Sequence, residues 1–283
     1  MPLIGKVSGM IRPKRLVDGG YLTWIYGASP FGLAQWGKAA YKKYDRKSDS
    51  LMLMDSSHNL RKDYAEDYKG HRAERYDKDD ERIAAKERVD MLREMIEEDP
   101  RIHSLQIDGL EADDLIACFI HLRLLNRPVS LIGVDKDLLQ LPTGSIKMSD
   151  HKGQVVGLKK FARSLPKILH DEILRPEHVL LTLALYGDKS DNVPRVVSKV
   201  NEVIPIIRNE KPFSQAKLIY GNRFISNLWL TVLPFPGIIS PEPSIGELPD
   251  ILDRLGPGWI GGDFKINREL IEQIDAYLLQ GEF

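Results

Sequence analysis

The chain has 283 residues, of which 42% are hydrophobic and 29% are charged, and its formal net charge at pH 7 is −1. This composition excludes a disordered chain and predicts a globular protein of one large domain or two smaller ones. Cys118 is the only cysteine, which excludes an intrachain disulfide and indicates a reducing compartment. No apolar run approaches the roughly 18 residues of a transmembrane helix, and the N-terminus lacks a signal-peptide core. We therefore expect a cytoplasmic protein with no membrane association.

The first half of the chain alternates predicted strands and helices. Apolar strands are predicted at 14–18 and 51–55, each ending in an aspartate, with a tight turn at Gly19 and Gly20. Helices are predicted at about 29–44 and 80–98, from the acidic turn to about 125, and at 138–141. Further strands are predicted at 101–108, 129–135 and 145–149, with an edge strand at 153–157. This alternation predicts an α/β fold with a mostly parallel central sheet flanked by helices.

The second half is predicted to be mainly helical. Helices are expected at 158–165, 166–174 and 176–186, in much of 195–232, and at 267–279. The proline-rich stretch 233–258 is expected to be loop-rich.

Acidic residues mark the expected carboxyl edge of the sheet. Glu111, Asp113 and Asp114 lie within four residues of one another where a helix begins, a crowding of like charge that a multivalent cation would compensate. Asp18, Asp55 and Asp135 stand at the ends of predicted parallel strands, and binding sites in such sheets form beyond those ends. For one such aspartate a cap or a turn is the usual explanation, but the whole set indicates a site.

The candidate ligands are all carboxylates. None comes with His or Cys at ligand spacing, which selects Mg²⁺ or Mn²⁺ over zinc. One Mg²⁺ takes only one or two carboxylates, so two ions are expected, an arrangement suited to phosphodiester hydrolysis. The nine candidates are Asp18, Asp55, Glu111, Asp113, Asp114, Asp135, Asp137, Asp188 and Asp191.

Six motifs, in order, resemble those of the 5′-nuclease family. They are Leu16-Val-Asp-Gly19, Met54-Asp55, Tyr68-Lys-Gly-His-Arg72, Gly109-Leu-Glu-Ala-Asp-Asp114, Val134-Asp-Lys-Asp137 and Gly187-Asp-Lys-Ser-Asp-Asn192. The family includes phage 5′–3′ exonucleases, phage RNase H, flap endonucleases and the 5′-nuclease domain of bacterial DNA polymerase I. Each motif alone is common by chance, but six in the family's order, over roughly residues 14–194, are specific.

The resemblance implies roles for these residues. The first five acids, from Asp18 to Asp114, resemble one metal site and the last four, from Asp135 to Asp191, resemble a second. Lys69 and Arg72 resemble catalytic cations on a helical arch at about 58–98, through which single-stranded 5′ ends pass. Tyr68 resembles an aromatic side chain that stacks on a base. Arg61 and Lys62 are expected to bind nucleic acid as well.

The family pattern also implies a domain organisation. A PIN-like 5′-nuclease core that includes the arch would occupy 1–174. A helical DNA-binding part, resembling a degenerate helix-hairpin-helix, and the C-terminal region would occupy 175–283.

Two segments depart from the family pattern. After Asn192 the family usually has a glycine-rich hairpin that holds K⁺ and duplex phosphates, whereas residues 193–200 contain no glycine. This argues against the K⁺ site and leaves Arg195 and Lys199 as the expected phosphate contacts. The helix expected after Asp18, Tyr21-Leu-Thr-Trp-Ile-Tyr26, lacks an arginine that many relatives place there.

The expected function is therefore a Mg²⁺-dependent 5′–3′ exonuclease or flap endonuclease. It would act on DNA with 5′ ends or flaps, and on RNA in RNA–DNA hybrids, as a monomer in the cytoplasm of a bacterial or phage-infected cell, in replication or primer removal. Two alternatives stay open. One is a non-catalytic, structure-specific DNA-binding replication factor, which has no use for nine acids near phosphates. The other is a related ribonuclease, which typically needs only about four.

Overall fold

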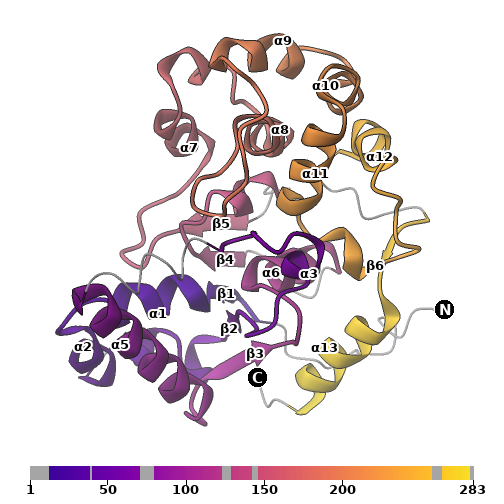
Figure 1. The fold of residues 1–283 in the computed structure, drawn as a ribbon. Helices are drawn as coiled ribbons and strands as arrows, with labels where there is room; N and C mark the ends of the chain where they lie inside the picture. The colour runs from indigo at the N-terminus through magenta and orange to yellow at the C-terminus, as the bar shows by residue number, and fades with distance from the viewer. Residues whose placement is uncertain are drawn as a thin grey trace.

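The computed structural model describes residues 13–38, 40–70, 80–122, 129–141, 146–256 and 263–280. Within them, five parallel strands form one sheet in the order β3-β2-β1-β4-β5 (Figure 1). The predicted α/β fold with a mostly parallel sheet is confirmed. The strands are β1 (Arg15–Asp18), β2 (Ser50–Met54), β3 (His103–Gln106), β4 (Val129–Ile132) and β5 (Ile146–Ser149).

Alternate side chains of the strands enter two different apolar layers. Val17, Met52 and Met54 pack with the layer that holds α1 (Gly19–Gly27), α2 (Gly32–Lys38) and α5 (Asp80–Glu97). Leu51 and Leu53 pack with the layer that holds α6 (Ala112–His121). A sheet covered by helices on both faces explains why its strands are apolar at consecutive positions.

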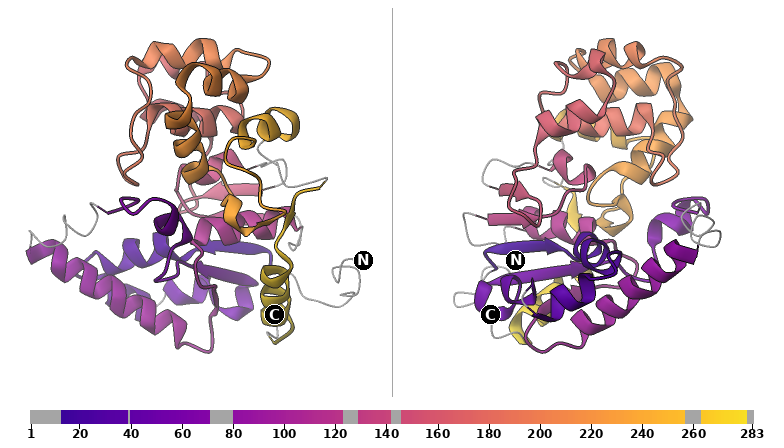
Figure 2. Two further views of the ribbon diagram at one scale, coloured as in Figure 1. Left: turned by 45° about the vertical axis from the view of Figure 1, so that its right-hand side comes forward. Right: turned by 90° about the vertical axis from the view of Figure 1, so that its left-hand side faces the viewer.

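The second half of the chain is helical and sits beyond β5. Figures 1 and 2 show α7 to α12 gathered on that side, while α13 lies near β3. One apolar cluster runs from Leu16 through these helices to Leu278, so packing marks no separate core at the predicted boundary between 174 and 175. The helices are α7 (Leu158–Ser164), α8 (Pro176–Tyr186), α9 (Val203–Ile207), α10 (Pro212–Tyr220), α11 (Asn222–Thr231), α12 (Leu248–Leu255) and α13 (Arg268–Gln280).

The glycines after β1 begin a helix rather than a turn. A Cβ at Gly19 would lie 2.2 Å from Met54 Sδ and 2.7 Å from the Leu53 carbonyl oxygen, so only glycine lets α1 start against β2. Asp18 caps the helix by accepting a hydrogen bond from Tyr21 N at 2.9 Å. The helix expected at 29–44 is also shorter, since α2 covers only its middle and a 3₁₀ turn occupies Ala40–Lys43.

The stretch 233–258, expected to be loop-rich, contains α12. Pro249 lies in its first turn, where proline costs no hydrogen bond. Asp253 on α12 caps the start of α10 by accepting hydrogen bonds from Phe213 N at 2.9 Å and Ser214 N at 2.8 Å. A short strand, β6 (Ile239–Ser240), also pairs antiparallel with β7 (Lys265–Ile266) in this part of the chain.

Two other elements are smaller than expected. The helix predicted at 166–174 is a 3₁₀ turn, Lys167–Leu169, in which backbone N–H groups bond three residues back, as His170 N does to the Lys167 carbonyl. The edge strand at 153–157 is reduced to a single bridge between Ser149 and Val155. Among the described residues, no helix combines the length and the apolarity needed to cross a lipid bilayer.

Candidate active site

The acids at the strand ends converge on one cavity. It has a volume of about 700 Å³, and its lining includes Asp18, Asp55, Asp113 and Asp135. It opens where β1 and β4 are neighbours, the point at which the strand order reverses and open α/β sheets form their sites. A Cβ at Gly133 would lie 3.2 Å from Asp18 Cβ, so glycine lets the chain after β4 pass close to the end of β1.

Asp55 sets the position of the acidic turn. Its Oδ1 accepts a hydrogen bond from Ala112 N at 2.8 Å, which fixes the start of α6. Glu111 immediately precedes the helix and is buried, and Asp113 in the first turn faces the cavity. The structure thus brings Asp18, Asp55 and Asp113 to one cavity. With Glu111, which lies two residues before Asp113, we call them the first carboxylate group.

Asp114, predicted as a metal ligand, is placed elsewhere. It is buried, its Oδ1 accepts from Arg61 NH2 at 2.9 Å, and its Oδ2 pairs with Arg61 NH1. Its Oδ1 also accepts from Phe235 N at 2.8 Å. Consecutive residues on a helix point about 100° apart, so Asp113 reaches the cavity while Asp114 reaches the core. Asp114 therefore holds a buried ion pair in this structure.

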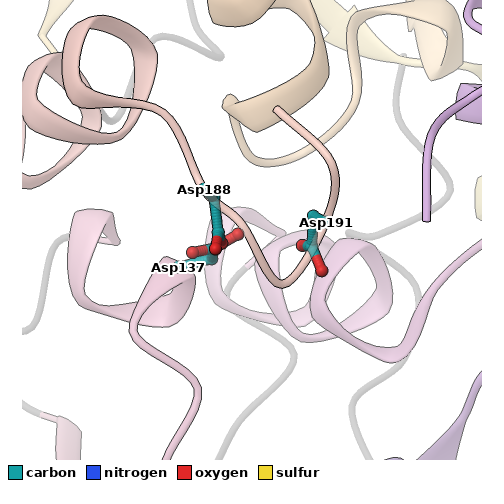
Figure 3. Close-up of side chains that lie close together, drawn as sticks. All are labelled: Asp137, Asp188 and Asp191. Atoms are coloured by element: carbon teal, nitrogen blue, oxygen red, sulfur yellow. The ribbon is translucent and has the colours of Figure 1, made fainter. Parts of the chain in front are cut away.

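Asp137, Asp188 and Asp191 form a second group (Figure 3). One carboxylate oxygen from each lies within 4.8 Å of the others. Asp137 begins a 3₁₀ turn after β4, and the other two come from the loop after α8. Asp188 and Val193 exchange backbone hydrogen bonds of 2.9 and 2.8 Å that close this loop. Asp135 lies between the two groups in sequence and lines the cavity.

Without a metal ion, four of the carboxylates, Asp18, Asp113, Asp135 and Asp137, have raised pKa values. Burial, and then the charge of Asp135, raise the pKa of both Asp113 and Asp137 well above the ordinary value. Burial and the charges of Asp55 and Asp135 raise the pKa of Asp18 to about 7, although the hydrogen bond from Tyr21 lowers it. Asp137 Oδ1 is also buried, with no hydrogen-bond partner among the described residues. A divalent cation would supply the charge that this oxygen-only donor set lacks, so the residues fit Mg²⁺ or Mn²⁺.

Two lysines balance part of this charge. Lys69 Nζ pairs with Glu111 Oε1 and lies 4.0 Å from Asp191 Oδ2, so it reaches both groups. Although burial opposes the effect, Lys69 and then Arg61 lower the pKa of Glu111 to about 2. Lys136 Nζ lies 2.5 Å from Asp188 Oδ2 and lowers the pKa of Asp188 against the effect of burial. Sequence reasoning assigned Lys136 no role, although it lies inside the motif Val134-Asp-Lys-Asp137.

The base of the predicted arch is docked on the second group. Lys69 N donates to the Asp191 carbonyl at 3.0 Å, and Asn192 Nδ2 donates to the Asp67 carbonyl at 2.9 Å. Tyr68 packs with Val193 and Leu230. In the described part of the arch, α3 (Leu60–Tyr64) and α5 are the helices. Arg72, predicted to be catalytic, lies outside the described residues.

The residues predicted to bind nucleic acid divide into buried and exposed sets. Tyr68 is 4% exposed and donates to Glu111 Oε2 at 3.1 Å, so its ring has no free face for the predicted stacking on a base. Arg61 is 2% exposed, which corrects its prediction as a phosphate contact. Lys62, Arg195 and Lys199 are exposed and can reach a ligand.

An exposed aromatic residue at the cavity was predicted from the sequence only to pack in the core or on the surface. Trp24 is 43% exposed and lines the cavity together with Tyr21. The signal was the spacing of three within α1, which puts both rings on the helix face that continues from Asp18.

Sequence comparisons find similar known proteins. Residues 30–166 match the model of the 5′–3′ exonuclease N-terminal, resolvase-like domain. A 5′–3′ exonuclease of Buchnera aphidicola subsp. Schizaphis graminum is 29% identical over 183 residues, which cover 64% of this chain and 58% of the relative. A DNA polymerase I of Lactococcus lactis subsp. cremoris is 31% identical over 140 residues, 48% of this chain and 15% of the relative. The chain thus spans less than two thirds of the length of these curated relatives.

Solved structures share the fold over nearly the whole chain. The bacteriophage T5 5′-exonuclease with bound zinc is 20% identical, with a TM-score of 0.62, over 95% of this chain and 99% of that chain. The T5 D15 flap endonuclease, in a pseudo-enzyme-product complex with DNA and metal ions, is 17% identical, with a TM-score of 0.62, over 94% of this chain and 97% of that chain. At these identities the likeness shows the fold.

Proposed function

We propose that this chain belongs to the 5′-nuclease family and is a 5′–3′ exonuclease and flap endonuclease that hydrolyses phosphodiester bonds of DNA. The match of residues 30–166 to the 5′–3′ exonuclease domain model and the similarity to a 5′–3′ exonuclease support this assignment. The observation that carries the proposal is the pair of adjoining carboxylate groups at the carboxyl edge of the sheet, with Lys69 reaching both. Related proteins described as nucleases support it, one of them in complex with DNA and metal ions.

The carboxylates would hold two divalent cations, Mg²⁺ or Mn²⁺. These ions would make the attacking water more acidic and balance the charge on the leaving oxygen. The first group, Asp18, Asp55, Glu111 and Asp113, would hold one ion. Asp137, Asp188 and Asp191 would hold the other, with Asp135 close enough to serve either.

The cationic and aromatic side chains would hold the nucleic acid. Lys69 would turn from Glu111 to the scissile phosphate once a cation neutralises that carboxylate. Trp24 would stack on a base without reading its sequence, and Lys62, Arg195 and Lys199 would contact phosphates farther along the strand. Arg72 keeps its proposed catalytic role on the family pattern alone.

We infer that the substrate carries a 5′ end or a single-stranded 5′ flap, of DNA or of RNA paired with DNA, and that the monomer acts in replication or primer removal. The core, 1–174, would carry the first carboxylate group, Lys69 and Asp137. Residues 175–283 would supply Asp188 and Asp191 to the second group and the exposed phosphate contacts of Arg195 and Lys199.

Cleavage of end-labelled flap, nicked and RNA–DNA hybrid substrates, with Mg²⁺ or with EDTA, tests this function. We expect cleavage near the 5′ end only with the metal, and products with 5′ phosphates. Binding without cleavage under all conditions would identify a DNA-binding factor instead, and cleavage confined to RNA would identify a ribonuclease.

A variant of the second group tests the assignment of the site. Asp188→Asn should lower the cleavage rate on the order of 1000-fold and leave flap binding in place, because the amide keeps the shape and removes the charge. Asp250→Asn, on the exposed face of α12, is the matched control and should cleave normally. Wild-type cleavage by Asp188→Asn would refute the mechanism.

A further inference from the structure

Arg61 is a fully buried cation outside the set of proposed catalytic groups. It lies on α3, at the foot of the arch, and is 2% exposed. Placing a guanidinium in a protein interior is costly unless its charge and its N–H groups are satisfied. Its partners therefore indicate what the burial achieves.

The Arg61 guanidinium contacts two acids, Glu111 just before α6 and Asp114 in its first turn. It forms a two-pronged ion pair with Asp114, as described above. NH1 also donates to Glu111 Oε2 at 3.2 Å, an oxygen that accepts Tyr68 OH at 3.1 Å as well. Two donors thus hold Oε2, and Oε1 of the same carboxylate is the oxygen turned toward Lys69.

A third segment closes the arrangement from the C-terminal side. Nε of Arg61 donates to the Leu230 carbonyl at 3.0 Å, and NH2 donates to the Val232 carbonyl at 3.3 Å. The guanidinium carbon lies 5.1 Å from the centre of the Phe235 ring, and Phe235 N donates to Asp114. One side chain therefore joins the arch base, the acidic turn and residues 230–235.

We propose that Arg61 is a positioning residue: it orients Glu111 so that Oε1 faces the cation, and it ties that orientation to the seating of residues 230–235. This inference rests on the proposed function, because it gives Glu111 a cation to bind. Asp114 serves as the anchor that holds Arg61 in place, which explains why a second aspartate follows Asp113 without reaching the cavity.

Titration of the folded protein with Mn²⁺, followed by calorimetry, tests this role without measuring activity. Arg61→Lys keeps the charge but loses the planar fork, so it cannot hold Asp114, Glu111 and both carbonyls at once. We expect the first-group affinity for Mn²⁺ to fall about 10- to 100-fold, the range typical when a side chain that orients a ligand is changed. Arg88→Lys is the matched control, because Arg88 donates to the Gly27 and Ala28 carbonyls, and its affinity should match the wild type.

Hydrogen exchange at the Phe235 amide gives a second readout on the same samples. Faster exchange together with weaker Mn²⁺ binding supports the coupling. Faster exchange with wild-type Mn²⁺ affinity would show that Arg61 only supports the fold, and would overturn the proposal.

Asp114→Asn decides the case if Arg61→Lys does not fold. Asparagine keeps the oxygen that accepts from Phe235 N but loses the charge that pairs with Arg61. Arg61 should then pair more closely with Glu111, so Mn²⁺ should bind less tightly. Unchanged affinity in this variant would also overturn the inference. Failure of the wild type to bind Mn²⁺ would instead contradict the proposed function itself.

Discussion

Lys69 is the counter-charge of the metal-free site, because its ammonium group reaches Glu111 and Asp191 together. A cation at the first group would displace it and free it for phosphate. Lys69→Ala should therefore lower the single-turnover cleavage rate about 100- to 1000-fold, as expected when a charge that stabilises the transition state is removed. DNA binding should change far less.

Lys62→Ala is the control for that experiment, because Lys62 is a neighbouring lysine that is exposed on α3. It should raise KM a few-fold and leave the single-turnover rate intact. Equal rates for wild type and Lys69→Ala would remove Lys69 from the chemistry.

Trp24, rather than Tyr68, is expected to contact a base. Stacking on an exposed aromatic side chain contributes about 1–3 kcal/mol per base. Trp24→Ala should thus weaken binding of a flap substrate about tenfold or more, measured by fluorescence anisotropy. Tyr68→Phe should bind as well as the wild type, because only its hydroxyl contact with Glu111 is lost. Unchanged binding by Trp24→Ala would remove Trp24 from the contact with the base.

For single residues, the sequence predicts which acids belong to the site but not the role of each acid. Asp18, Asp55 and Asp135 follow apolar strands, and parallel strands end at one edge, so their meeting was predictable. Asp113 and Asp114 look equivalent in the sequence. Only the seating of α6 decides which one faces the cavity, and that seating depends on Arg61 and residues 230–235, which are remote in sequence.

Among the elements, the loop after α8 depends on Gly187. Its φ is +77°, and a Cβ there would lie 2.6 Å from the Val193 carbonyl and 2.8 Å from Arg195 N. Gly187→Ala should therefore displace the loop that carries Asp188 and Asp191. We expect a clear fall in melting temperature and weaker Mn²⁺ binding at the second group.

Gly153→Ala is the control for Gly187→Ala, because it introduces the same kind of backbone strain without a steric clash. Gly153 has a φ of +84°, and a Cβ there would meet no atom of the described residues within 4 Å. This variant therefore carries only the left-handed backbone cost of about 1–2 kcal/mol. It should bind Mn²⁺ normally. Similar metal affinity for both variants would show that the loop after α8 tolerates the clash.

The elements that sequence reasoning found are those fixed by local pattern. Strands β1, β2 and β4 and helix α8 follow directly from apolar runs and their boundaries. The helix after Asp18 was expected over Tyr21–Tyr26, but its start at Gly19 was missed. A glycine pair normally signals a turn, whereas here the close approach of Met54 requires glycine. Helix α12 was missed because its proline lies in the first turn, where it is compatible with a helix.

For the whole molecule, metal-free stability should fall as the pH rises from 5 to 8. The pKa of Asp18 is raised from 3.8 to about 7, so the folded state binds this proton more tightly than the unfolded state. The associated stability is fully present below pH 3.8 and is lost as the pH rises through about 7. Asp113, Asp135 and Asp137 have raised pKa values, chiefly through burial, and act in the same direction. Urea unfolding in EDTA at several pH values measures this trend.

A divalent metal ion should reverse this fall in stability with rising pH, since it binds the ionised carboxylates. At a free concentration 100 times Kd, one bound ion adds about 2.7 kcal/mol to the free energy of unfolding. The lowered pKa of Glu111, about 2, affects stability only below its ordinary value of 4.5 and leaves the range from pH 5 to 8 undisturbed. Metal-free protein that grows more stable from pH 5 to 8 would contradict this account.

The contact between Arg61 and the Leu230 carbonyl joins residues 169 positions apart, and this has a consequence during synthesis. A ribosome releases the strand-end aspartates first, then the loop with Asp188 and Asp191, and later the segment that seats Arg61. On the proposed role of Arg61, Glu111 is therefore held in its metal-binding orientation on a nascent chain only after residues 230–235 have emerged.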